Sequence, residues 1–160
     1  MKYKIYTDGS CRGNQFSSNV GGWSALIFEN NEIVPIKTLS GCKRDTTNNK
    51  MELNACINGL FYIYKTKGTD SIDEIEVYTD SAYISNCFKE KWWIKWEQHN
   101  WKTSTKKDVK NKDLWQQLLK IYQDLQKVNF IHVKAHAGNK FNEMADQKAI
   151  EAIKNCIKER

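Results

Sequence analysis

KYKIYTDGS, residues 2–10, is the stretch that decides the fold of this 160-residue chain. Apolar and polar side chains alternate along it as in a β-strand, and the turn-forming pair Asp8-Gly9 ends the strand. Residues 74–81 (EIEVYTDS) repeat the pattern and reach Asp80. If the two strands lie side by side and parallel, both carboxylates lie at the edge where open α/β sheets bind ligands.

Two more carboxylates occupy matching places in predicted helices. Thr46 or Thr47 can cap a helix that carries Glu52 in its first turn. Asp146 stands near the start of a last helix, over residues 144–157. Any one carboxylate alone is more typical of a cap or a turn, but four in matching settings favour a shared site. Their mutual repulsion indicates a hard divalent cation such as Mg²⁺, and with it phosphate chemistry.

The remaining hydrophobic patterns complete a mixed sheet with helices on its faces. An antiparallel hairpin is predicted around the turn Asn30-Asn31. The further segments with strand or helix periodicity are Gly21–Glu29, Glu32–Ser40 and Asn129–Lys134 as strands, and Ser81–Phe88 and Leu114–Leu125 as helices. This order predicts an α/β fold in a single domain over residues 1–160. Its five-stranded sheet combines an antiparallel meander with parallel strands.

Positive charge is concentrated in one segment. The chain carries a net charge of +6, and residues 89–112 hold eight Lys against three acidic residues. Such a local basic surface predicts a polyanionic partner whose affinity falls as salt rises, with an ordinary solvated face as the alternative.

Tryptophans are interleaved with these lysines. Trp92 and Trp96 suit packing on sugars or bases while the neighbouring lysines hold phosphates. For Trp101 and Trp115 the favoured interpretation is a small helical subcore. Residues 89–112 are called here the basic protrusion, after the place that the family resemblance described below implies for them.

The cysteines and the hydropathy bear on the compartment. Five cysteines are scattered along the chain without a CxxC pair, which predicts reduced intracellular thiols. No stretch resembles a signal peptide, and none approaches the roughly 20 apolar residues of a membrane span. We therefore expect a cytoplasmic protein that does not contact a membrane.

Six segments, in order and nearly end to end, resemble ribonuclease H type 1. They are TDGSC (7–11), TTNNKME (46–52), TDS (79–81), WKT (101–103), VKNKDLW (109–115) and VKAHAG (133–138). The resemblance implies an RNase H-like sheet and an endonuclease that cuts the RNA strand of an RNA/DNA hybrid with two Mg²⁺ ions, or Mn²⁺. The products would carry 5′-phosphate and 3′-hydroxyl ends.

The same resemblance assigns roles to residues. Those implied to be catalytic and metal-binding are Asp8, Glu52, Asp80 and Asp146, and His136 is implied to assist water activation or product release. The candidates for reading 2′-hydroxyls of the RNA strand are Cys11, Asn14, Asn48 and Asn49. Thr47 and Asn111 are expected to grip a DNA-strand phosphate, and Trp92 and Trp96 to hold the DNA through the basic protrusion.

Departures from the family pattern affect substrate contacts rather than chemistry. Lys50, a further expected substrate contact, stands where Arg is usual and offers a point charge in place of a planar fork. Ala82 stands where the family commonly has Gln. Glu97 and Gln98 make the basic protrusion less basic, and residues 15–20 lack the usual Pro-Gly. We expect these changes to alter affinity for the hybrid.

Two other functions compete with the hybrid-specific endonuclease. One is a hybrid-binding protein with weak catalysis, and the other is a metal nuclease that cuts DNA alone, such as an integrase or junction resolvase. The retained carboxylates argue against the first, and the short chain argues against the second. We further expect a complete, stand-alone, bacterial-type monomer without an additional N-terminal hybrid-binding domain and without an obligatory protein partner.

Overall fold

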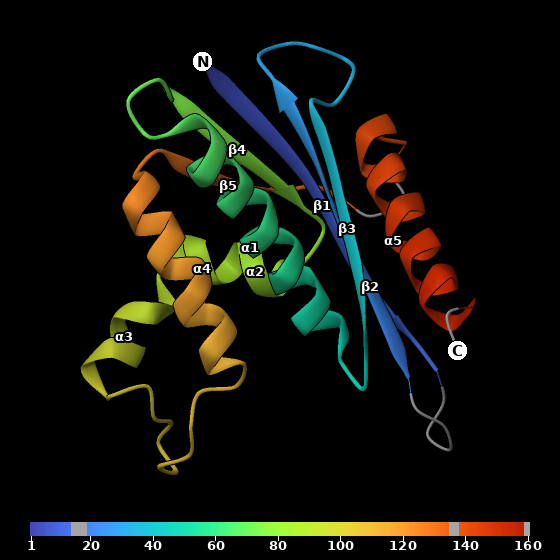
Figure 1. The fold of residues 1–160 in the computed structure, drawn as a ribbon. Coiled ribbons are helices and arrows are strands. Elements are labelled where there is room, and N and C mark those ends of the chain that lie inside the picture. Colours follow the sequence, from blue (N-terminus) through green and yellow to red (C-terminus); the bar gives the residue numbers. More distant parts are fainter. Residues whose placement is uncertain (14–18, 135–137, 159–160) are drawn as a thin grey trace.

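The computed structural model describes residues 1–13, 19–134 and 138–158 (Figure 1). Its centre is a five-stranded sheet in the order β3-β2-β1-β4-β5, in which β1 runs antiparallel to β2 and parallel to β4. The strands are β1 (Lys2–Arg12), β2 (Val20–Glu29), β3 (Lys37–Arg44), β4 (Glu74–Thr79) and β5 (Val128–His132). The predicted α/β class, with its meander and parallel strands, is confirmed.

Helices cover both faces of the sheet, as Figure 1 shows. The helices are α1 (Asn48–Lys67), α2 (Ala82–Glu90), α3 (Trp92–Gln98), α4 (Lys112–Leu125) and α5 (Lys140–Lys158). α1 packs on β1 and β2, with α4 against α1, and α5 packs alone on the opposite face, mainly on β2 and β1. No helix in the described ranges is both long and apolar enough to cross a bilayer.

The alternation along β1 divides its side chains between the two faces. Tyr3 and Ile5 belong to a large core beneath α1 that also includes Leu60 and Trp115. Tyr6 points the other way, into a smaller cluster. Its members are Tyr6, Leu26, Phe28 and Ala145, with Tyr78, Phe141 and Met144 packed around them. The sheet therefore separates a large core from a small one.

The second strand of the predicted hairpin lies further along the chain than expected. β3 covers Lys37–Arg44 instead of Glu32–Ser40. Ile33 and Val34 are 71% and 69% exposed, and Pro35 has no N–H to give to a strand ladder. Pairing with β2 resumes beside Ile36, whose N–H donates to Ile27 O.

The place of Glu52 in one helix and the start of another helix need correction. Thr47 does cap α1, since its side chain accepts a hydrogen bond from Lys50 N, but the helix begins at Asn48 and Glu52 lies in its second turn. α5 begins at Lys140 rather than Met144, because the side chain of Asn139 accepts from Asn142 N and holds the first turn. Asp146 therefore also lies in a second turn, beyond the first-turn reach of the helix dipole.

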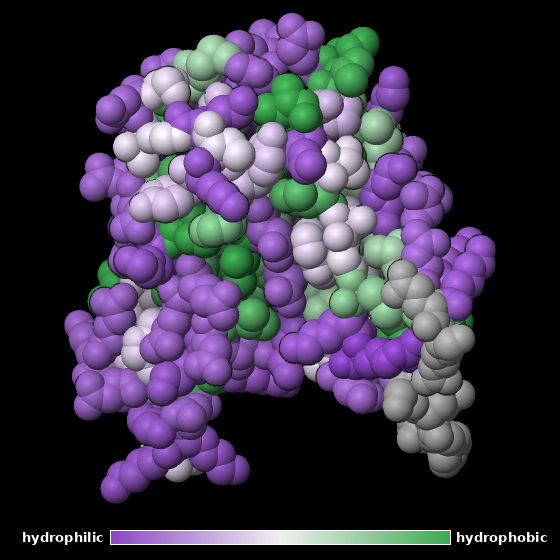
Figure 2. Space-filling view, viewed as in Figure 1, coloured by the Kyte–Doolittle hydropathy of each residue, from purple (hydrophilic) through white to green (hydrophobic). Residues whose placement is uncertain are grey.

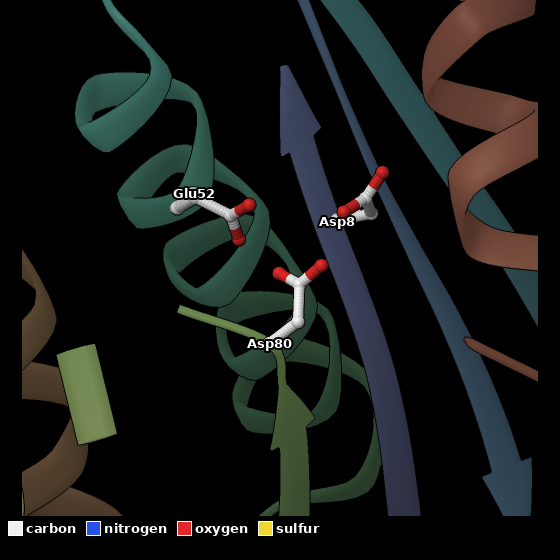
Figure 3. Close-up of side chains that lie close together, drawn as sticks. All are labelled: Asp8, Glu52 and Asp80. Carbon is white, nitrogen blue, oxygen red and sulfur yellow. The ribbon is translucent and has the colours of Figure 1, made fainter. Parts of the chain in front are cut away.

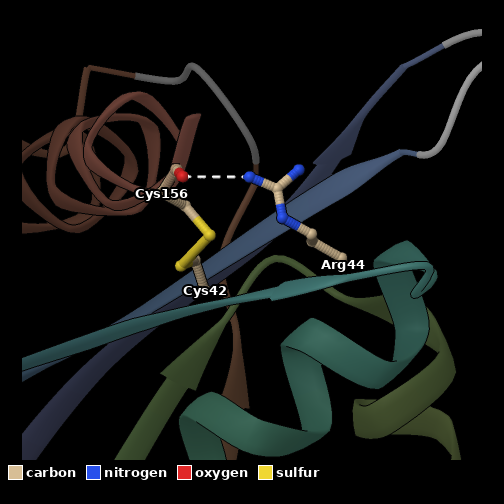
Figure 4. Close-up of a disulfide and its surroundings, with 3 residues drawn as sticks. All are labelled: Cys42, Arg44 and Cys156. Carbon is tan, nitrogen blue, oxygen red and sulfur yellow. Dashed lines mark hydrogen bonds between the residues drawn. A yellow bond between two sulfur atoms is a disulfide. The ribbon is translucent and has the colours of Figure 1, made fainter. Parts of the chain in front are cut away.

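The prediction of reduced thiols is wrong for two of the five cysteines. Cys42 on β3 and Cys156 on α5 form a disulfide across a sequence separation of 114, while Cys11, Cys56 and Cys87 are free. Figure 4 shows this bridge beside Arg44, whose guanidinium donates to Cys156 O at 3.1 Å. The pairing depends on α5 packing near an edge strand, which no local sequence pattern indicates.

Candidate active site

The carboxylates meet where two parallel strands separate. The β1–β4 ladder ends at the pair Tyr6 and Tyr78, and β4 itself ends at Thr79. The predicted end of the first strand at Asp8-Gly9 is wrong, because pairing with β2 carries β1 on to Arg12. Asp80 follows the end of β4, at the level where β1 presents Asp8. The end of the shorter strand thus opens a space beside β1.

Three carboxylates turn toward this space, from β1, from α1 and from the residue that follows β4. Asp8, Glu52 and Asp80 each offer one oxygen, and these oxygens all lie within 4.8 Å of one another (Figure 3). Asp8 and Glu52 are buried, with 5% and 6% of their surface exposed. The arrangement offers the hard oxygen ligands that Mg²⁺ and Mn²⁺ prefer.

Gly9 brings α1 close enough to place Glu52. A Cβ atom at Gly9 would lie 2.5 Å from the backbone nitrogen of Glu52, so a side chain there would push the helix away. The Gly9 N–H donates to Glu52 Oε1 at 3.1 Å and fixes one carboxylate oxygen. Glu52 is thereby held against β1 from both the backbone and the side chain.

Burial and repulsion raise the pKa values of the buried carboxylates. The pKa of Asp8 rises to about 8, first because of burial and then because of the charges of Asp80 and Asp146. The pKa of Glu52 is also raised, first by burial and then by the charges of Asp8 and Asp80. A nearby positive charge would stabilise the ionised form of these carboxylates.

Two buried oxygens in this cluster suit a cation directly. Within the described part of the chain, Asp8 Oδ2 and Glu52 Oε2 have no hydrogen-bond partner. Buried polar atoms are rarely left in this state without a reason such as an ion. The carboxylate oxygens of Asp8, Glu52 and Asp80 are therefore chemically suited to bind divalent metal ions.

Asp146 approaches Asp8 from the opposite face of the sheet. Its side chain, on α5, lies close enough to the Asp8 carboxyl to add to the rise in the pKa of Asp8. The group of three oxygens within 4.8 Å does not include Asp146. Asp8 therefore lies between Asp146 on one side and the other two carboxylates on the other.

Ser24, which the sequence reading did not single out, supports this side of the site. It is the cross-strand partner of Asp8, fully buried, and its hydroxyl donates to Ala145 O on α5 at 2.5 Å. Ala145 directly precedes Asp146. A lone Ser inside a strand gives no sequence signal for such a role.

The comparisons with known proteins agree with this geometry. The RNase H family model matches residues 1–154. The ribonuclease H of Acetivibrio thermocellus is 43% identical over 158 residues, which cover 98% of both chains. The ribonuclease H of Caldicellulosiruptor saccharolyticus is 44% identical over 151 residues, or 94% of each chain. The chain belongs to the ribonuclease H family. It is thus an endonucleolytic hydrolase.

Solved structures of ribonucleases H share the fold. LC9-RNase H1 superposes with a TM-score of 0.72 at 27% identity, over 96% of this chain and 72% of that one. LC11-RNase H1, solved in complex with an RNA/DNA hybrid, gives a TM-score of 0.74 at 24% identity, over 97% and 99% of the two chains.

A cavity of about 630 Å³ lies where α1 and α4 begin. Three expected substrate contacts line it: Thr47, Lys50 and Asn111. Lys110 and Lys112, two lysines of the basic protrusion, also line it, together with Lys43, which the sequence did not indicate. Asp108 and Asp113 line it too, and Asp108 pairs with Lys112. The lysines still outnumber the aspartates, and positive charge beside hydroxyl and amide groups suits a phosphate.

The other expected contacts with the hybrid fall in different settings. Cys11 is half-buried and its Sγ lies 3.6 Å from Thr46 O, while Asn48 is exposed and Asn49 half-buried in the first turn of α1. Asn14 and His136 lie outside the described residues. Their predicted roles stay predictions.

The tryptophans of the basic protrusion pack against one another. Trp96 contacts Trp101 at 5.3 Å and Trp115 at 5.6 Å between ring centroids, and Trp92 contacts Trp96 at 6.2 Å. Trp115 is fully buried and Trp101 half-buried, as the subcore interpretation predicted. Trp92 and Trp96 are each half-buried. Figure 2 shows mostly hydrophilic side chains on the part of the molecule that extends below α3.

Proposed function

We propose that this chain hydrolyses the RNA strand of RNA/DNA hybrids and leaves 5′-phosphate and 3′-hydroxyl ends. The observation that carries the proposal is the cluster of the buried Asp8 and Glu52 with the half-buried Asp80. Two carboxylate oxygens in it, Asp8 Oδ2 and Glu52 Oε2, have no hydrogen-bond partner among the described residues. The cluster stands in a chain of the ribonuclease H family. A relative of the same fold was solved with such a hybrid bound.

Asp8, Glu52, Asp80 and Asp146 would hold two Mg²⁺ ions, which Mn²⁺ can replace. Bound divalent ions supply activation of the attacking water and neutralise the leaving 3′-oxygen. The chain contributes preorganisation, because Gly9 fixes Glu52 and burial keeps bulk water from the carboxylates. His136 would accept or donate a proton during water attack or product release.

Contacts away from the carboxylates would select the substrate. We assign Cys11, Asn14, Asn48 and Asn49 to the 2′-hydroxyls of the RNA strand. Thr47, Lys50 and Asn111 would grip a phosphate of the DNA strand in the cavity between α1 and α4. Trp92 and Trp96, with the lysines of the basic protrusion, would hold the DNA strand farther along.

The test is cleavage of an end-labelled RNA/DNA hybrid in Mg²⁺, beside matched double-stranded RNA, double-stranded DNA and single strands. We expect cuts only in the RNA strand of the hybrid. Asp80→Asn should lower the rate by about a hundredfold or more, since it removes a ligand for ions that lower the barrier by several kcal/mol. Asp70→Asn, at an exposed turn residue, is the matched control and should retain the rate.

The other outcomes have definite meanings. Tight binding of the hybrid without cleavage in Mg²⁺ or Mn²⁺ would favour the hybrid-binding protein, and cleavage of DNA alone would favour another metal nuclease. We also propose a single-domain, cytoplasmic monomer that needs no protein partner. Sedimentation of the active protein at 18.7 kDa would support the monomer.

A further inference from the structure

Tyr83, on α2, connects parts of the molecule that the proposed function uses. Its hydroxyl oxygen accepts hydrogen bonds from Trp115 Nε1 at 2.7 Å and from Asn111 Nδ2 at 3.3 Å. Its ring packs against Trp92, with centroids 6.1 Å apart. α2 begins two residues after Asp80. One side chain thus touches the cavity residue Asn111 and Trp92 of the basic protrusion, and it lies three residues along the chain from Asp80.

The side chain of Asn111 is held in an unusual way. Asn111 is the N-cap residue of α4, where an asparagine ordinarily accepts a hydrogen bond from the backbone of its own helix. Here that side chain makes no capping bond, and its amide donates to Tyr83 instead. The backbone has φ 60°, a left-handed conformation that asparagine tolerates better than most residues. The Tyr83 hydroxyl is therefore the contact that orients this amide.

The orientation matters because of where Asn111 lies. It lines the same cavity as Thr47, Lys50 and Lys110. An amide NH₂ group has two hydrogens, so one can donate to Tyr83 while the other donates to a phosphate. A donor that is already fixed loses less freedom when its ligand binds, and so binds it more tightly.

We propose that Tyr83 is a positioning residue for hybrid binding: its hydroxyl holds the Asn111 amide in place for a phosphate of the DNA strand. The inference rests on the proposed function, which assigns Asn111 to that phosphate. A purely structural role is the competing explanation, because the buried Trp115 N–H also needs an acceptor.

The experiment is a double-mutant cycle of Tyr83→Phe and Asn111→Gly. Phenylalanine keeps the ring and removes the hydroxyl, and glycine removes the amide while it accepts a positive φ. Affinity is measured by fluorescence anisotropy with a labelled RNA/DNA hybrid in the absence of divalent ions. KM and kcat are measured with Mg²⁺. Trp115→Phe is the matched control, since it removes the indole donor but leaves Tyr83 and Asn111.

We expect Tyr83→Phe to raise Kd and KM about five- to tenfold, as the loss of one hydrogen-bonding arrangement does, with kcat changed less than about twofold. In the Asn111→Gly background the same substitution should change Kd less than about twofold. Trp115→Phe should lower Tm, as Tyr83→Phe does, but leave Kd within about twofold.

Three results for Tyr83→Phe and its control would overturn the inference. They are an unchanged Kd in Tyr83→Phe, an equal rise of Kd in both backgrounds, and an equal rise in Trp115→Phe. If Asn111→Gly alone leaves Kd unchanged, the phosphate assignment of Asn111 fails and the inference fails with it. If the wild type binds but does not cleave the hybrid, and the coupling remains, only the proposed cleavage fails.

Discussion

The two faces of the sheet are stabilised differently. Beneath α1 and α4 lies a large apolar core that includes Ile5, Leu60 and Trp115. Beneath α5 the apolar cluster is smaller, and specific bonds supplement it: the Ser24–Ala145 hydrogen bond, and the Cys42–Cys156 disulfide near the C-terminal end of α5. The α1 face depends on buried area, and the α5 face on individual contacts.

Small residues allow close packing on both faces. A Cβ at Gly22 would lie 2.4 Å from Ala149 O on α5, just as one at Gly9 would collide with α1. Asp8 lies between the faces, with Glu52 on α1 and Asp146 on α5 among its neighbours. The geometry of the carboxylates therefore depends on both packing arrangements at once.

The largest effect is expected in the α1 core. Leu60→Ala should destabilise the protein by about 4 kcal/mol and lower Tm by roughly 10 °C, because a rigid core cannot collapse around the cavity. Leu26→Ala, equally buried on the α5 face, is the matched comparison and should cost about 3 kcal/mol, since a single helix can shift to fill space. Urea unfolding measures both, and a larger loss in Leu26→Ala would contradict the comparison.

The disulfide should have the next largest effect. Cys42→Ser should lower the free energy of unfolding by about 2–4 kcal/mol under oxidising conditions, because the bridge closes a loop over a sequence separation of 114. Urea unfolding with and without dithiothreitol measures this loss. Reductant should destabilise the wild type and leave Cys42→Ser unchanged.

Cys11→Ser provides the control for the disulfide, since Cys11 is a free thiol. That variant should respond to reductant as the wild type does. A response in Cys42→Ser as large as that in the wild type would assign the effect to another thiol. The result also concerns the cellular compartment of the protein, because a reducing cytoplasm keeps cysteines as thiols and the disulfide then does not form.

Local signals in the sequence predicted much of the fold and the carboxylate site. Asp80 was placed because strand periodicity stops at it, and Thr47 because a hydroxyl before a helical pattern caps it. The predicted strand end at Asp8-Gly9 was wrong, since β1 continues to Arg12. Two other boundaries were wrong because of a nearby residue. Pro35 cannot donate to a strand ladder, so β3 begins after it, and the Asn139 side chain caps the first turn of α5, so that helix begins before Met144.

The remaining features depend on contacts between distant parts of the chain. Ser24 and Ala145 are 121 residues apart, and Cys42 and Cys156 are 114 apart. Such pairs form only after α5 has packed on the sheet. Tyr83 was missed for the same reason, since its hydroxyl gains its role from residues on α4. Sequence periodicity predicts elements and the residues at their ends, but not which side chains meet across them.

Removing a carboxylate should stabilise the metal-free protein. The pKa of Asp8 in the fold, about 8, lies above its ordinary value of 3.8. The folded state therefore binds more protons than the unfolded state between these values, and stability falls as pH rises through this window. At pH 8 in EDTA, Asp8→Asn should gain at least about 1.4 kcal/mol, the equivalent of one pKa unit.

Thermal unfolding with and without Mg²⁺ measures this gain. The difference in stability between Asp8→Asn and the wild type should be smaller at pH 5, because the Asp8 carboxyl of the folded wild type is protonated there. Mg²⁺ should raise Tm of the wild type more than that of the variant, because the ion compensates a repulsion that the variant lacks. Equal stability of the two proteins in EDTA at both pH values would show that repulsion at Asp8 does not limit stability.

The smallest predicted effect concerns the contact that joins the α5 face to the site. Ser24→Ala should cost only about 1 kcal/mol, or about 3 °C in Tm, because it removes one buried hydrogen bond and little volume. Ser40→Ala, the exposed cross-strand partner of Ser24 on β3, is the matched control and should change stability by less than about 0.5 kcal/mol.

The catalytic consequence of Ser24→Ala should exceed what its stability loss suggests. The hydroxyl of Ser24 holds the turn of α5 that carries Asp146, so its removal should raise the Mg²⁺ concentration needed for half-maximal hybrid cleavage. In an Asp146→Ala background the same substitution should leave that concentration unchanged while its small effect on Tm persists. A shift of equal size in both backgrounds would mean that Ser24 acts through Asp8, its partner across the strands, and that the α5 face contributes stability without tuning the site.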